Sequence, residues 1–167
     1  VGRAIASFER TIVTGRTPFD RWADGDSTAV SAEARQGFAL FTGKAGCANC
    51  HAGWRFTDDS FHDIGVPVAA SAPDSGRGTI VPLETMHFAF KTPGLRNVAR
   101  RALYLHDGSA ATLDDVVALY DRGGVARPSR SPLIRPLGLT VAERRALVAF
   151  LHTLTSADTV AAPRALP

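Results

Sequence analysis

The sequence of 167 residues has no run of about 20 apolar residues, the length that a helix needs to cross a bilayer. A membrane-spanning segment is therefore not expected. Lys and Arg (19) exceed Asp and Glu (16) only slightly, and the arginines are scattered along the chain. Nucleic acid is thus not an expected partner, whereas a small excess of positive charge would suit an acidic redox protein or a small anionic donor.

Cysteine is almost absent, since the only two stand in Cys47-Ala48-Asn49-Cys50-His51. A zinc site would need two further ligands, and a thioredoxin-like dithiol would need a surrounding βαβ pattern, which is missing; a structural disulfide is the remaining alternative. The C-x-x-C-H arrangement is typical of haem c, held by two thioether bonds and ligated by the adjacent histidine. It predicts one covalent haem c at Cys47, Cys50 and His51, matured in an oxidising compartment outside the cytoplasm.

The chain starts at Val1 without methionine and without the segments of a signal peptide. We expect that an export signal or a whole preceding domain has been removed. The length is that of one ordinary domain, so residues 1–167 are expected to form a single domain.

Apolar residues at helical spacing predict a mostly α-helical fold with long loops. The expected helices cover residues 2–14, 31–41, 95–99, 112–122 and 140–154, and the first should bury a face formed by Ile5, Phe8 and Ile12. Segments 17–26 and 65–82 are rich in turn residues and are expected to be loops. We find no convincing strand and no internal repeat.

Several residues could approach the haem iron opposite His51. Met86 is the only methionine, but it lies in an unpatterned stretch that favours simple packing. The histidines at 62, 87, 106 and 152 are more often hydrogen-bonded surface or core residues than ligands. Tyr120 occupies the apolar face of its helix, where a buried phenol needs a partner; a backbone carbonyl would also serve.

Three stretches, in order, carry a family resemblance: ASFERTIVTGRTPFDRWADGD, GFALFTGKAGCANCHAGWRFTDDSFHDIG and FKTPGLRNVARRALYLHDGSAATLDDVVALYDRGG. Together they resemble the C-terminal haem domain of bacterial di-haem cytochrome c peroxidases and MauG-type enzymes. The resemblance implies a periplasmic protein, a missing N-terminal haem domain or separate haem subunit that reacts with peroxide, and a redox protein as donor or acceptor. It also places the distal ligand of this haem, Met in typical peroxidases and Tyr in MauG-type enzymes, at Tyr120.

The resemblance implies further site residues. Around the haem we expect an apolar wall formed by Phe56, Phe61, Pro93, Leu95 and Leu119. Arg96 either pairs with a haem propionate or is a solvated arginine, and Trp54 either covers the haem edge or relays electrons. The family often binds calcium through backbone carbonyls at a Thr-x-Pro element; this chain has Arg101 and Leu103 there, so a calcium ion is possible at those carbonyls.

Three functions therefore remain open. The leading one is the electron-transfer domain of a di-haem peroxidase or MauG-type oxidoreductase. The alternatives are a stand-alone monohaem electron shuttle and a haem-based redox or ligand sensor. No residue of the chain is identified as a general base for peroxide cleavage.

Overall fold

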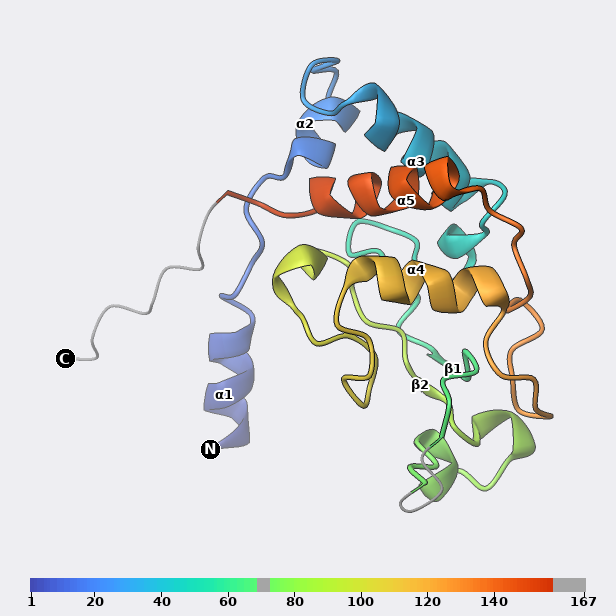
Figure 1. Ribbon diagram of the computed structural model, residues 1–167. Coiled ribbons are helices and arrows are strands. Elements are labelled where there is room, and N and C mark those ends of the chain that lie inside the picture. Colours follow the sequence, from blue (N-terminus) through green and yellow to red (C-terminus); the bar gives the residue numbers. More distant parts are fainter. Residues whose placement is uncertain (69–72, 158–167) are drawn as a thin grey trace.

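The computed structural model describes residues 1–68 and 73–157, and these form a mostly helical fold (Figure 1). The α-helices are α1 (Gly2–Glu9), α2 (Pro18–Ala23), α3 (Ala32–Thr42), α4 (Leu113–Arg122) and α5 (Val141–Thr153). Single 3₁₀ turns lie at Cys47–Asn49, Arg77–Thr79, Glu84–Met86 and Val98–Arg100. The predicted fold class, mostly α with long loops, is confirmed.

Helices α3 and α5 lie against one another above α4 and form the centre of the core (Figure 1). Their close approach depends on Gly37, because a Cβ atom there would lie 1.9 Å from the carbonyl oxygen of Ala146. Phe150 of α5 is 1% exposed and packs on Phe41 of α3, with 4.9 Å between the ring centroids. Aromatic packing of this kind stabilises one fixed arrangement of the two helices.

The helix starts at Ser31, Thr112 and Thr140 are confirmed as N-caps. Thr112 forms a capping box with Asp115, and Thr140 forms one with Glu143, so orphan backbone N–H groups at both helix starts are satisfied. The longest helix, α5, has 13 residues, and none of the described helices is long and apolar enough to cross a membrane.

Segment 17–26 differs from the expected loop, because Thr17 and Asp20 form a capping box and α2 follows. The six-residue helix was too short for a periodic signal, and its Phe19 packs on Phe38 and Phe150. Two short strands were also missed: β1 (Phe61–His62) pairs antiparallel with β2 (Phe90–Lys91). Two residues each are too few to show alternation in a sequence.

Two expected helices have different bounds. The segment expected at 95–99 forms a 3₁₀ turn at Val98–Arg100 instead. Helix α1 ends at Glu9, not at residue 14, and none of its residues is buried. In Figure 1 it stands apart from the other helices, joined to α2 by an extended segment. The expected buried face is therefore exposed in the described part of the chain.

Candidate functional site

A cavity of about 430 Å³ lies between the turn that carries the cysteines, the helix α4 and one face of α5. Its walls are mainly apolar. They include Leu113, Val116, Val117 and Tyr120, which recur at helical spacing on α4, and Leu147 and Leu151 of α5. This is a size and lining typical of a site for an organic cofactor.

The first 3₁₀ turn, Cys47–Asn49, places both thiols and the His51 ring at this cavity. Gly46 enters the turn with φ 65°, and the N–H of His51 donates to the Cys47 carbonyl over 2.9 Å. The two cysteines form no disulfide in the structure. Burial raises the pKa of Cys47 to about 11 and also raises the pKa of Cys50. A reactive dithiol needs the opposite shift, so this environment does not suit thioredoxin-like chemistry.

The His51 ring is fixed by a hydrogen bond between its Nδ1 atom and the Phe56 carbonyl oxygen, 2.9 Å apart. Phe56 adopts φ 56°, a left-handed conformation that turns the chain there. With Nδ1 as the donor, Nε2 is the nitrogen that can ligate a metal. Burial lowers the pKa of His51, which favours the neutral imidazole that a metal requires.

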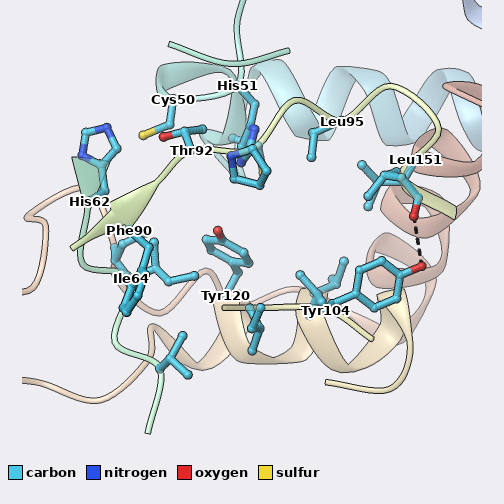
Figure 2. A pocket seen from close by; sticks show the side chains of 18 of the residues that line it. Cys50, His51, His62, Ile64, Phe90, Thr92, Leu95, Tyr104, Tyr120 and Leu151 are labelled. Atoms are coloured by element: carbon cyan, nitrogen blue, oxygen red, sulfur yellow. Dashed lines mark hydrogen bonds between the residues drawn. The ribbon is translucent and has the colours of Figure 1, made fainter. Parts of the chain in front are cut away.

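Tyr120 projects from α4 into the cavity from the side opposite His51, and the two side chains point toward one another in Figure 2. Within residues 1–68 and 73–157 its hydroxyl makes no hydrogen bond, whereas the hydroxyl of Tyr104 donates to the Val98 carbonyl oxygen over 3.1 Å. Burial raises the pKa of Tyr120. The backbone partner that the sequence allowed for Tyr120 is thus not found there, and the phenol lacks a partner on the protein side.

Of the five expected wall residues, Pro93 and Leu95 line the cavity. Phe56, Phe61 and Leu119 do not. Phe56 packs in the aromatic core against Phe41 and supports His51 through its carbonyl instead. These placements depend on the direction of each side chain, which spacing alone does not give.

Arg96 also lies outside the cavity lining, since it pairs with Asp20 over 2.7 Å and donates to the Trp54 carbonyl oxygen. In the structure Arg96 thus forms an ion pair with α2, and its contact with a haem propionate stays a prediction. Trp54 itself is 71% exposed and does not line the cavity. Both residues of the expected calcium element, Arg101 and Leu103, do line it.

Met86 and the histidines at 87 and 152 are not among the lining residues. His106 lines the cavity and is stacked on Phe90, with 3.6 Å between centroids and 11° between planes. His62 also lines it but binds Asp58 over 2.8 Å. Of the described histidines other than His51, only His62 and His106 thus line the cavity, and each contacts another side chain there.

Sequence reasoning missed the pair formed by Asp58 and His62, whose polar atoms lie within 4.8 Å of each other and of the Cys50 sulfur. Burial raises the pKa of Asp58, but the hydrogen bonds from His62 and Ser60 outweigh it and lower this pKa to about 2. The four-residue spacing of Asp58 and His62 was the available signal, but this spacing brings side chains together only in a helix, and the sequence predicts no helix there.

Several known proteins resemble this chain. Residues 34–155 match the family described as Cytochrome c. The chain is 53% identical over 156 residues to the methylamine utilization protein MauG of Methylorubrum extorquens, covering 92% of this chain and 43% of that protein. It is 37% identical over 188 residues to the cytochrome-c peroxidase IdrP1 of Denitromonas iodatirespirans, covering 93% and 49%.

Among solved structures, a MauG-like protein associated with microbial copper homeostasis matches with a TM-score of 0.86 and 30% identity, over 96% of this chain and 54% of that one. The diheme peroxidase BthA of Burkholderia thailandensis matches with a TM-score of 0.69 and 28% identity, over 84% and 46%. The chain thus spans about half the length of the relatives that it matches.

Proposed function

Because the chain belongs to the cytochrome c family, we propose that it is the electron-transfer haem domain of a di-haem oxidoreductase of peroxidase or MauG type. The family implies covalently bound haem c. The chain covers less than half of the MauG and IdrP1 proteins, which supports a second haem domain outside these 167 residues. In this proposal residues 1–167 represent the C-terminal haem domain.

One observation carries the proposal: two unpaired thiols, a fixed imidazole and an unpartnered phenol meet at the same apolar cavity. Cys47 and Cys50 would hold the porphyrin by thioether bonds, and Nε2 of His51 would ligate the iron. A bound haem c supplies one-electron redox chemistry. The protein contributes the fixed orientation of His51, through Phe56, and a wall that limits water access.

We further propose that Tyr120 is the second axial group. Its position opposite His51 and its missing hydrogen-bond partner support this role. A phenolate is a hard anion, so it stabilises ferric over ferrous iron relative to a methionine ligand, and axial ligands shift haem potentials over about 0.8 V. Such a haem would suit oxidative chemistry better than low-potential electron storage.

Two finer expectations belong to the same proposal. Because haem c is attached outside the cytoplasm in bacteria, we place the protein in the periplasm. We also propose calcium at the backbone carbonyls of Arg101 and Leu103, to be completed by a ligand from the second domain. Metal analysis of the full-length protein tests the calcium site: one calcium per polypeptide is expected, and its absence after dialysis against buffer containing micromolar calcium contradicts the site.

The attachment is tested by mass spectrometry of the denatured protein. We expect one haem mass more than the polypeptide for this segment, and we expect Cys47→Ser and Cys50→Ser each to weaken attachment. Ala48→Ser, between the two cysteines, is the matched control and should retain the haem. Complete extraction of colour from the denatured wild-type protein would show that the haem is not covalent.

The haem count of the native assembly separates the alternatives. Two haems per polypeptide support the di-haem oxidoreductase. One haem on a freely dissociating protein supports the electron shuttle, and a ligand-dependent spectral change coupled to a partner supports the sensor.

A further inference from the structure

Apart from histidines, the charged side chains that line the cavity are all cationic. They are Lys91, Arg101 and Arg135, and none of the described lining residues is Asp or Glu. An apolar site with cations and no carboxylates in its wall suits a flat organic molecule that carries anionic groups. A haem is such a molecule, because its two propionates are carboxylates at one edge of a largely apolar macrocycle.

Helix α5 runs along the cavity and marks its two ends. At the start of α5, the Glu143 carboxylate binds over 2.9 Å to Lys44, which stands three residues before Cys47. At the other end, the Leu154 carbonyl oxygen accepts from the Asn97 backbone N–H over 2.9 Å. The helix rises about 16 Å from Glu143 to Leu154 at about 1.5 Å per residue. The cysteines and the turn after Asn97 therefore lie at opposite ends of the cavity.

The cysteines determine which edge of a haem faces each end. Thioether bonds form at the two vinyl groups, which share one edge of the porphyrin, and both propionates leave from the opposite edge. In Figure 2, Cys50 lies on one side of the cavity, and Tyr104 and Leu151 lie on the other. With both thioethers formed, the propionates would therefore point toward the end that carries Tyr104.

Arg101 lies at this same end. Its backbone N–H donates to the Val98 carbonyl oxygen over 3.1 Å, and the same carbonyl accepts the Tyr104 hydroxyl over 3.1 Å. Arg101 is exposed and lines the cavity together with these two residues. Within residues 1–68 and 73–157 the structure shows neither an ion pair nor a side-chain hydrogen bond for Arg101. Its guanidinium group is thus available to an anion at the mouth of the cavity.

The other two cations of the wall are less suited to this role. Lys91 is already paired with Asp59 over 2.5 Å. Arg135 stands three residues before Gly138, whose carbonyl oxygen accepts from Lys44 over 3.0 Å, and it therefore belongs to the end that carries the cysteines. Position along the cavity and lack of a carboxylate partner together distinguish Arg101.

We propose that the Arg101 guanidinium pairs with a haem propionate and so sets part of the charge around the iron. The inference rests on the proposed haem site and adds an anion-binding side chain to it. Arginine stays protonated, and its planar fork matches a carboxylate. Arg96, the partner expected from the resemblance, is paired with Asp20 over 2.7 Å and does not line the cavity. The proposed calcium contact uses the backbone carbonyl of Arg101 and leaves its side chain for this pair.

The redox equilibrium between the haem-loaded protein and a reference dye tests the pair. A propionate anion stabilises ferric over ferrous iron, and the guanidinium offsets its charge. We therefore expect Arg101→Ala and the neutral Arg101→Gln to shift the equilibrium toward the ferric form by roughly twofold to fivefold, as for a partly exposed ion pair. Arg101→Lys keeps the charge and should retain most of the wild-type equilibrium. These differences should shrink as the salt concentration rises, because salt screens exposed charges.

Arg100→Ala is the matched control, because it removes the same charge one residue away and outside the cavity lining. It should shift the equilibrium less than Arg101→Ala does. Equal equilibria for the wild type and Arg101→Ala overturn the inference, and so does a shift that appears in Arg96→Ala alone. A shift in Arg101→Ala that accompanies loss of calcium also overturns it, because the backbone carbonyl would then carry the effect.

The mass of covalently bound haem, measured in the same samples, reports on the proposed function separately. A wild-type protein without covalent haem contradicts the proposed function. Intact haem attachment with no shift in Arg101→Ala contradicts only the role of Arg101, so either idea can fail alone.

Discussion

Two tyrosines in contact with the same cavity differ in their hydroxyl environment. Tyr104 donates to the Val98 carbonyl oxygen, while Tyr120 faces His51 without a partner among the described residues. We expect Tyr120→Phe to change the ferric absorption spectrum and to raise the haem potential on the order of 100 mV, because an anionic ligand of the ferric state is lost. Spectroelectrochemistry of the haem-loaded protein measures both effects.

Tyr104→Phe is the matched control for this test. It removes the same hydroxyl from the cavity wall at the cost of one hydrogen bond, about 1 kcal/mol of stability, and should leave spectrum and potential unchanged. Met86→Leu should also be silent, since Met86 does not line the cavity. A spectrum that changes in Met86→Leu and not in Tyr120→Phe would assign the haem to an ordinary His/Met shuttle.

At the scale of elements, the crossing of α3 and α5 determines how tightly the cavity is closed. Gly37→Ala would place a Cβ atom 1.9 Å from the Ala146 carbonyl oxygen and 2.8 Å from the Phe150 Cβ atom. Alanine normally stabilises a helix interior by about 1 kcal/mol relative to glycine. Here we expect the variant to lose about 1–3 kcal/mol instead, because backbone must move to relieve the overlap.

Urea unfolding, followed by circular dichroism, measures this loss. Gly2→Ala in α1 is the control, because a Cβ atom there meets nothing within 4 Å and the change should be neutral or slightly stabilising. An unfolding midpoint for Gly37→Ala equal to that of the wild type would mean that α3 and α5 can move apart at no cost in stability. The close packing of α3 on α5 would then not constrain the site.

At the scale of the whole molecule, a buried ion pair joins loops that are far apart in sequence. Asp63 is 1% exposed and accepts from Arg127 Nε over 2.6 Å and from the Ser129 hydroxyl over 2.7 Å. Burial raises the pKa of Asp63, but the hydrogen bonds from Arg127, Gly65 and Ser129 outweigh it and lower the pKa below its usual value. The pair therefore links folding stability to pH.

The direction follows from the lowered pKa. Because Asp63 is more acidic in the folded than in the unfolded protein, its contribution is present above about pH 4 and is lost as the pH falls through the folded value. Asp63→Asn should cost about 3 kcal/mol at pH 7 and less at acid pH, by urea unfolding between pH 3 and 7. Asp24→Asn, which breaks an exposed pair with Arg16, should cost less than about 1 kcal/mol. Parallel pH curves for the wild type and Asp63→Asn would contradict this linkage.

The proposed division of catalysis between two domains also belongs to the scale of the whole molecule. If this segment is the electron-transfer half of a di-haem protein, the haem-loaded chain of 167 residues should exchange electrons with a redox dye but reduce hydrogen peroxide slowly. Restoring the second domain should raise peroxide turnover by orders of magnitude, as measured by stopped-flow oxidation of a reduced cytochrome donor. Rapid multiple turnover by the short chain alone would contradict the division of labour, and Ala48→Ser serves as an unaffected control in both forms.

Local chemistry explains what the sequence determined by itself. The C-x-x-C-H spacing predicted where a haem would attach, since two thiols and an imidazole on one short turn need no distant residue to define them. The N-caps at Ser31, Thr112 and Thr140 were equally readable, because a cap bonds backbone groups only two or three residues away. The apolar face of α4 was predicted from its period and does line the cavity.

Tertiary structure alone decided which side chains meet. Phe56 was expected at the haem wall but packs in the aromatic core, and Arg96 pairs with Asp20, 76 residues away, because side-chain direction depends on partners that spacing does not identify. The same limit applies to α1. Its apolar period predicted a buried face, but none of the residues of α1 is buried in the described part of the chain, because whether a face is covered depends on what packs against it.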